Sequence, residues 1–257
     1  MTLACDEVRT QQGDPVHRLI GTIPGARFAR YVAACQGTGV EPIEVYLWAS
    51  RVALAMFDDL GHVEVALRTA IAERLYDTYG SRWFERTDIL DHPTFKLIQD
   101  AKRSGGLGDL KVDESVYHGK LVATLMFGFW VKILGKGTNF DGQRRIYDTL
   151  IWKAAVREAF PNVGDLEREK VERAARDVKE LRNRVAHHEH IVWGVPLPGK
   201  RDTSGRMRRM SVTEAHNVLL RLAGYVDRGL HDWVVDNSRV PLAIQGCPLP
   251  NLDAFRL

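Results

Sequence analysis

The sequence from Lys179 to His190 reads Lys-Glu-Leu-Arg-Asn-Arg-Val-Ala-His-His-Glu-His and ends the most regular helical pattern of the chain. The pattern starts near Leu166, with Asp165 as the expected N-cap. Apolar residues then recur at intervals of three and four, which predicts a helix with one buried stripe. The stripe consists of Val171, Ala174, Ala175, Val178, Leu181 and Val185.

The last turns of this helix carry side chains that can do chemistry. At about 100° per residue, Arg182 falls beside the apolar stripe, whereas Asn183 and His187 share a different face because they are four residues apart. A guanidinium at the edge of a buried stripe is costly unless it has a partner. Arg182, Asn183 and His187 are therefore candidate site residues, with His188 and Glu189 as supporting candidates.

Composition limits the class of protein. The chain has 257 residues, of which 45% are hydrophobic, enough for a large core in one domain or in two closely packed ones. No apolar run is long enough for a membrane span, and the start of the chain lacks the pattern of a secretion signal. Cys5, Cys35 and Cys247 are widely spaced, which indicates ordinary thiols. We expect a cytoplasmic protein that crosses no membrane.

Helical periodicity recurs along most of the chain and strand-like alternation is nearly absent, so we predict an all-α fold. Residues 1–24 are predicted to be a loose lead-in, 25–235 a helical domain and 236–257 an irregular tail. Within the domain, N-terminal helices cover 25–103 and a helical core covers 115–235. The helices are expected at residues 26–36, 43–79 with a soft break near Gly61, 93–103, 120–134, 146–160 and 212–234.

Two further segments bear on function. Residues 120–134 are apolar on nearly every side and are predicted to form one central buried helix. Residues 192–209 contain two prolines and a basic cluster, for which a solvated loop is the default expectation. Their nearness to His187 makes them candidates for contact with a phosphate backbone. The candidate RNA-binding residues are Lys179, Lys200, Arg201, Arg206, Arg208 and Arg209.

Four segments together resemble a known family. Arg182-Asn183-x-x-x-His187 is similar to the Arg-x4-His motif of HEPN domains, and residues 181–189 resemble the C-terminal motif of Abi-like (abortive infection) bacterial proteins. Three other segments agree with that family in the same order. They are Asp59-Leu-Gly-His-Val-Glu-Val-Ala-Leu-Arg68, His118-Gly-Lys-Leu-Val-Ala-Thr-Leu-Met-Phe-Gly-Phe-Trp130 and Ala159-Phe-Pro161.

The resemblance implies a HEPN-like helical bundle with additional N-terminal helices, dimeric, with a composite site at the subunit contact. It implies metal-independent RNA cleavage without a cofactor, in a phage-defence or toxin system, with an antitoxin RNA or protein as a further partner. In this reading His187 transfers the proton, Arg182 holds the scissile phosphate, and Asn183 orients His187 or donates to the phosphate. The alternative is a catalytically silent HEPN module that binds RNA or a protein partner.

The residues leave other interpretations open. Arg182 and His187 can form a structural pair at the helix end, with Arg182 satisfied by Glu189 or by a carbonyl. A metal at His187, His188 and His190 is not expected, because no HExxH-type motif accompanies them. Catalysis by a Ser-His-Asp triad has no supporting signature. Glu64 and Arg68 are four residues apart, which is the spacing of an intrahelical ion pair, and we expect a solvated or interhelical pair there and not a catalytic one.

Overall fold

The computed structural model describes residues 15–108, 111–164 and 168–250. The chain is mostly helical, as predicted, but it also contains two small antiparallel sheets of two strands each. The expected N-cap Asp165 and helix start Leu166 lie outside the described residues, as does Cys5. None of the described helices is both long and apolar enough to cross a bilayer.

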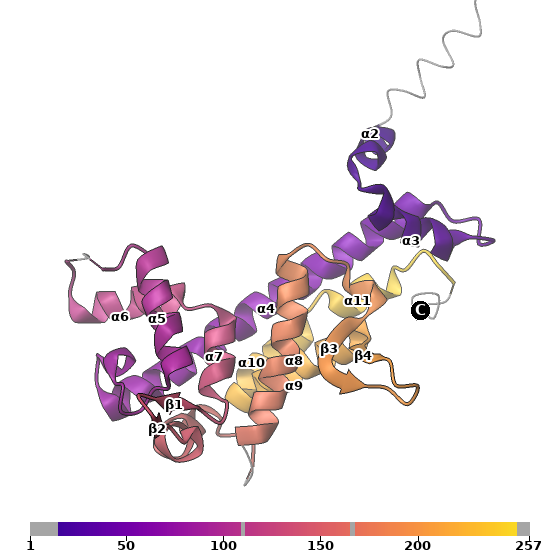
Figure 1. Cartoon of the computed structure of the whole chain (residues 1–257). Helices are drawn as coiled ribbons and strands as arrows, with labels where there is room; N and C mark the ends of the chain where they lie inside the picture. Colours follow the sequence, from indigo (N-terminus) through magenta and orange to yellow (C-terminus); the bar gives the residue numbers. More distant parts are fainter. Residues whose placement is uncertain (1–14, 109–110, 165–167, 251–257) are drawn as a thin grey trace, which may run out of the picture.

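The long helix α4 (Pro42–Tyr79) is the axis of the molecule, and the other elements are arranged along it (Figure 1). Pro42 lies in its first turn, where a missing N–H is harmless, and Gly80, at φ 82°, ends it. The predicted break near Gly61 is wrong. The helix continues because apolar residues before and after Gly61, such as Leu60 and Val63, are buried in one core.

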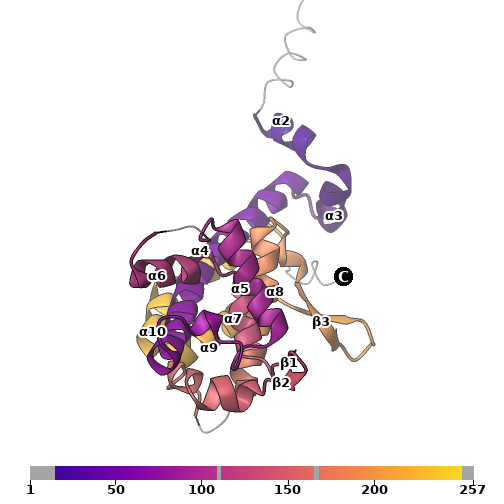
Figure 2. The same ribbon diagram turned by 60° about the vertical axis from the view of Figure 1, so that its left-hand side comes forward.

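The helix α8 (Arg168–Ala186) packs against α4, α7 (Phe127–Ile133) and α9 (Val212–Val226). Its predicted apolar stripe is buried at all six positions, so this part of the sequence interpretation is confirmed. The helices α5 (His92–Ser104) and α6 (Glu114–Thr124) lie toward one end of α4. At the other end lie α3 (Gly25–Cys35) and α11 (Val240–Gln245) (Figures 1 and 2).

Residues 120–134 do not form one helix. The chain breaks at Leu125 and Met126, whose backbones are extended, and separates α6 from α7. A straight helix that is apolar on every side needs neighbours all round it. The break instead re-aims the chain, so that Leu121 of α6 and Phe129 of α7 are both buried while Met126 is left exposed.

Residues 146–160 form a π-helix, η2 (Asp148–Lys153), and a 3-10 helix, η3 (Val156–Ala159), rather than one α-helix. The buried residues Tyr147, Ile151, Val156 and Phe160 follow at intervals of four or five, wider than an α-helix repeats. The predicted last helix is also divided, into α9 and α10 (Arg228–Asn237). At the break, the Asp227 carboxylate accepts the Leu230 N–H at 2.7 Å and caps α10.

The predicted loop at 192–209 is mostly regular structure, which corrects the sequence interpretation. After the 3-10 turn η4 (Ile191–Trp193), strands β3 (Val195–Arg201) and β4 (Met207–Met210) form a hairpin that projects from the helices (Figure 2). Its turn is closed by the Asp202 carboxylate, which accepts the main-chain N–H groups of Ser204 and Arg206. Prolines are tolerated because both strands are edges.

The second hairpin, β1 (Asn139–Phe140) with β2 (Gln143–Arg144), turns at Asp141 and Gly142, both at positive φ. The chain ends were predicted to be irregular, and both contain helices. Pro15–Thr22 forms α2 in the supposed lead-in, and α11 lies in the supposed tail. Short 3-10 helix η1 (Trp83–Glu85) packs its two aromatic residues into the core.

Candidate functional site

The candidate site is the C-terminal end of α8, where the backbone closes in a Schellman motif. The Glu189 N–H donates to the Arg184 carbonyl at 2.8 Å, and the His188 N–H donates to the Val185 carbonyl at 3.0 Å. His188 is left-handed, with φ 55°. This turn fixes the direction in which the chain leaves α8. His187 lies directly after the last helical residue, and its main-chain N–H still donates to the Asn183 carbonyl, as in the helix.

Arg182 is held across the interface between two helices. Its Nε lies 3.4 Å from Oε2 of Glu64 on α4, and both side chains are mostly buried. Glu64 is therefore the partner that a guanidinium beside the apolar stripe requires. Sequence reasoning paired Glu64 with Arg68 by spacing, and it could not find this contact because 118 residues separate the two groups.

Asn183 and His187 lie one turn apart on the same side of α8. Asn183 is half-buried and His187 is exposed. Among the described residues, no side-chain hydrogen bond engages the ring of the exposed His187. The arrangement therefore offers a proton-transfer group, an amide and a guanidinium within about two helical turns.

The two supporting candidates have structural roles in this chain. Glu189 forms an ion pair with Arg184, in which Nη1 of Arg184 lies 2.6 Å from Oε2 of Glu189. The alternative interpretation had paired Glu189 with Arg182 instead. His188 contributes its carbonyl oxygen, which accepts a hydrogen bond from Nη2 of Arg27 on α3. These contacts tie the turn after α8 to α8 itself, through Arg184, and to α3, through Arg27. The exposed His187 is the histidine one helical turn from Asn183.

Three residues of α3 clamp the segment that follows the candidate site, and sequence reasoning missed them. Besides Arg27, the Tyr31 hydroxyl hydrogen-bonds Nδ1 of His190, and the Arg30 guanidinium lies 4.4 Å from the ring centroid of Trp193. Tyr31 is fully buried. Burial, with a smaller contribution from the nearby Arg27 cation, lowers the pKa of His190 to about 4. His190 is thus a neutral structural residue at pH 7.

Three of the six basic residues predicted to bind RNA are engaged within the fold. The Lys200 ammonium contacts both carboxylate oxygens of Asp177, at 2.8 and 2.9 Å, and Arg201 donates to the Gly205 carbonyl. Arg209 donates to the carbonyls of Trp193 and Gly194, at 2.9 Å each. The Lys200 and Arg209 contacts hold the hairpin against α8 and η4, and the Arg201 contact lies within the hairpin turn, so all three charges have a structural use.

The remaining cations are less committed. Arg208 lies 3.5 Å from Glu214, where both side chains are about half exposed, and such a pair is weak. The Arg206 side chain is exposed at the hairpin turn. Lys179 lies on α8, one turn before Arg182 and Asn183, and its ammonium is 3.1 Å from Glu180. Lys179 is therefore the predicted cation that the fold brings closest along the helix to the candidate site.

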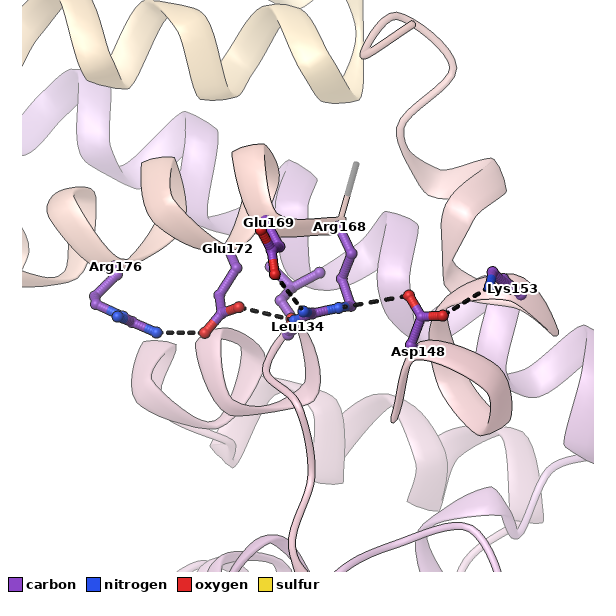
Figure 3. Close-up of polar contacts among 7 residues, drawn as sticks. All are labelled: Leu134, Asp148, Lys153, Arg168, Glu169, Glu172 and Arg176. Atoms are coloured by element: carbon purple, nitrogen blue, oxygen red, sulfur yellow. Dashed lines mark hydrogen bonds and ion pairs between the residues drawn. The ribbon is translucent and has the colours of Figure 1, made fainter. Parts of the chain in front are cut away.

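The first turn of α8 is anchored by a buried guanidinium that the sequence did not single out (Figure 3). Arg168 is 6% exposed, and its Nη1 donates to the Leu134 carbonyl at 2.7 Å and to Glu172 at 2.8 Å. Its Nε lies 3.8 Å from Asp148. The network joins α8 to the end of α7 and to η2, and so fixes the helix that carries the site.

A buried Asp-His-Ser cluster lies elsewhere, between α4, α9 and the end of α10. Oδ2 of Asp59 is 3.1 Å from Nε2 of His216 and 2.6 Å from the Ser238 hydroxyl, which is also 3.2 Å from Nε2. In a catalytic triad the histidine stands between serine and aspartate and uses both ring nitrogens. Here one nitrogen meets both partners, so the cluster is a structural clasp between helices.

Among residues 15–108, 111–164 and 168–250, no three His, Cys, Asp or Glu side chains converge in a way that could hold a metal ion. The ring of His190 is turned toward Tyr31, whereas His187 is exposed. Comparisons of the chain with models of protein families, with curated proteins and with solved structures found no match. The assignment of a function therefore rests on the residues of the site.

Proposed function

We propose that this chain is a metal-independent endoribonuclease of the HEPN type, acting as a dimer in an abortive-infection or toxin-type phage-defence system. The observation that carries the proposal is the end of α8. There Arg182, Asn183 and the exposed His187 stand on a helix whose first turn and exit are both fixed by hydrogen bonds. A catalytic group must be held in place by its surroundings in this way.

In the proposed reaction the 2′-hydroxyl of RNA attacks the adjacent phosphorus, and a base takes the hydroxyl proton. The P–O5′ bond breaks and the leaving oxygen receives a proton from an acid. The products are a 2′,3′-cyclic phosphate and a 5′-hydroxyl. His187 performs one of these proton transfers, since imidazole can do either near neutral pH. Arg182 and Asn183 donate to the phosphate oxygens as negative charge accumulates there.

The proposed site needs a second copy of the chain, because the acid and the base are two groups and each chain supplies one His187. The face of α4 next to Glu64 supports this requirement. Leu54, Phe57 and Val65 recur along it at helical spacing, and they are 68%, 53% and 49% exposed. Gly61 lies between them with open space above its Cα. An exposed apolar stripe of this kind favours a protein contact beside the Arg182–Glu64 pair.

One observation favours the alternative, a catalytically silent module that binds RNA or a protein. In a single chain Arg182 already has a carboxylate partner, and a phosphate must displace Glu64 to reach its Nε. If Arg182 stays paired with Glu64, the protein has the same fold but Arg182 makes no contact with a phosphate, and no cleavage results.

The test separates cleavage from binding. The wild-type chain, His187→Ala and the control His231→Ala, which changes another partly exposed histidine on α10, are incubated in EDTA with a mixed RNA substrate. The proposal predicts cleavage by wild type and His231→Ala but not by His187→Ala, with RNA affinity nearly unchanged in all three. Binding without cleavage by a folded wild-type dimer would establish the silent module instead. Expression toxicity should follow cleavage.

A further inference from the structure

A deep cleft lies beside α8, on the side of α5 and α7, and belongs to none of the roles described above. Its volume is about 920 Å³, the size of a ligand pocket. One wall is α8, another is the junction of α6 and α7, and the loop at residues 135–138 closes one end. The α8 side chains that line it are Glu172, Arg176 and Lys179 (Figure 3 shows the first two).

Two of the cations that line the cleft have no ion-pair partner among the described residues. Four cations line it, Lys132, Lys136, Arg176 and Lys179, together with three carboxylates. Each of the three carboxylates is already committed. Asp91 accepts the Thr138 N–H and hydroxyl, at 2.8 Å each, Glu172 pairs with Arg168 and Arg176, and Asp100 pairs with Arg103. Lys132 and Lys136 make no ion pair within the described part of the chain.

The loop that carries Lys136 is held firmly. Thr138 is bound to Asp91, the Tyr147 N–H donates to the Lys136 carbonyl at 3.2 Å, and a Cβ at Gly137 would meet the Arg145 carbonyl at 2.2 Å. Gly137 is at φ 70°, so only glycine fits this approach. The backbone that carries Lys136 is therefore fixed, so that only its side chain has to become ordered when an anion binds.

One part of the cleft wall is apolar. Leu97, Leu125, Met126 and Val131 line it, and Met126 is 67% exposed. Apolar surface against which a flat ring can lie, together with lysines on a rigid loop, suits a nucleotide, which has a base at one end and a phosphate at the other. A simple inorganic anion would use the lysines but not this wall.

The cleft leads to the candidate site. Arg176, Lys179 and Asn183 follow one another at intervals of three and four, so they form one row on α8. A strand whose phosphates follow this row reaches Asn183 one turn, about 5.4 Å, beyond Lys179. Successive phosphates of an extended strand lie on the order of this distance apart.

We propose that this cleft binds nucleotides of single-stranded RNA next to the scissile phosphate, with phosphates on Lys132, Lys136 and Lys179 and a base against the apolar wall. The inference rests on the proposed function for the identity of the ligand as RNA. A free nucleotide has the same chemistry, and the experiment therefore has an arm for it.

The experiment uses the full chain carrying His187→Ala, so that RNA stays intact during binding. Fluorescence anisotropy with a short labelled single-stranded RNA compares this parent with Lys132→Glu/Lys136→Glu and with Lys136→Glu alone, which changes an exposed loop residue. The matched control is Arg228→Glu/Arg239→Glu, with the same charge change on exposed residues outside the cleft. Circular dichroism checks the fold, and a calorimetric titration with uridine and adenosine monophosphates forms the second arm.

The cleft predicts at least about tenfold weaker RNA binding in the double lysine variant, a partial loss in Lys136→Glu and less than a twofold change in the control. The salt dependence, d log K/d log[salt], should become shallower by about 1.4, the value for two lost phosphate contacts on a single strand. If the lysine variants and the control lose RNA affinity to the same extent, the proposal that RNA binds in the cleft is overturned.

The proposal and the proposed function can fail separately. RNA binding that depends on the lysines, from a wild-type chain that cleaves nothing, supports the cleft and contradicts the ribonuclease. Cleavage by wild type, together with RNA binding that does not depend on the lysines, supports the ribonuclease and contradicts the cleft as the RNA-binding site. If RNA does not bind the parent but a mononucleotide does, and the lysine variants lose it, the cleft holds a free nucleotide and the RNA assignment is overturned. If neither RNA nor a mononucleotide binds, the proposal that the cleft is a binding site is overturned.

Discussion

His188 occupies a backbone conformation that favours glycine, at the position where glycine most often ends a helix. Its carbonyl oxygen makes the contact to Arg27, and its exposed side chain makes no hydrogen bond that the structure describes. The Schellman turn therefore depends on the backbone of His188 and not on its imidazole.

We predict that His188→Gly stabilises the chain by about 0.5–1 kcal/mol, because glycine adopts φ 55° without steric cost. His188→Ala, which removes the imidazole but keeps Cβ, should give no such gain. Urea unfolding followed by circular dichroism measures both. A loss of stability in His188→Gly would mean that the imidazole contributes to the turn.

His190 makes the stability depend on pH. Its pKa is about 4 in the folded chain, below the ordinary value of 6.5, so the unfolded chain binds more protons between these values. The contribution of neutral His190 to the unfolding free energy is fully present above pH 6.5 and is lost as the pH falls from 6.5 toward 4. The maximum loss is about 3 kcal/mol.

His190→Gln, which keeps a hydrogen-bonding group beside Tyr31, should have a smaller decrease in unfolding free energy between pH 7.5 and 5 than wild type. Burial also lowers the pKa of His118, so a residual decrease is expected in the variant. Urea titrations at the two pH values measure the difference. Identical pH slopes in the two proteins would contradict a buried, neutral His190.

The Arg182–Glu64 pair should compete with phosphate. Replacing Glu64 with glutamine removes the charge and frees the guanidinium, so we predict two- to fivefold tighter RNA binding, on the order of the energy of a partly exposed pair. The gain should disappear in Glu64→Gln/Arg182→Ala. Anisotropy titrations check both variants, and a gain that survives the loss of Arg182 would rule out competition at this pair.

At the scale of elements, the sequence predicted well where periodicity alone decides. The stripe of α8 and the span of α4 follow from apolar residues at intervals of three and four. The failures occurred where tertiary contacts or single polar residues override the pattern. Asp227 divides a periodic stretch by capping α10, and burial at wider intervals makes residues 148–153 a π-helix. The hairpin at 195–210 carries prolines and charges, so it lacks strand-like alternation.

The same limit applies to the candidate site. The position of Arg182, Asn183 and His187 near the end of one helix could be read from spacing. Glu64, which pairs with Arg182, is distant in sequence and is brought to α8 only by the packing of α4 against it. The same holds for Arg27 and Tyr31 of α3, which contact His188 and His190 in the segment after α8. Lys200 and Arg209 were assigned to RNA because no local signal shows that their charges are used inside the fold.

The anchor of α8 gives a prediction at this scale. Removing the buried Arg168 guanidinium leaves the Leu134 carbonyl without this donor and Glu172 without one of its two cations. We predict that Arg168→Ala lowers the unfolding free energy by about 1–3 kcal/mol, the cost of leaving a buried acceptor without its donor. Arg173→Ala, an exposed position on the same helix, should change it by less than about 0.5 kcal/mol. Similar effects in the two variants would show that the network is not an anchor.

At the scale of the whole molecule, the proposed ribonuclease needs two chains, and we propose that they meet across the apolar stripe of α4 formed by Leu54, Phe57 and Val65. Phe57→Asp places a charge in the middle of this stripe and should convert the dimer to a monomer in sedimentation experiments, with loss of cleavage. Leu242→Asp is the control, since Leu242 is 71% exposed on α11, away from the stripe. A Phe57→Asp chain that remains dimeric and active would place the subunit contact elsewhere.

The central claim is 2′-hydroxyl attack assisted by His187, and the ends of the RNA products test it most directly. A defined oligoribonucleotide is incubated with the wild-type protein in EDTA, and mass spectrometry identifies both fragments. We expect a 2′,3′-cyclic phosphate on one fragment, a 5′-hydroxyl on the other, and neither product with His187→Ala. Fragments ending in a 3′-hydroxyl and a 5′-phosphate, or cyclic-phosphate products that persist in His187→Ala, would contradict it.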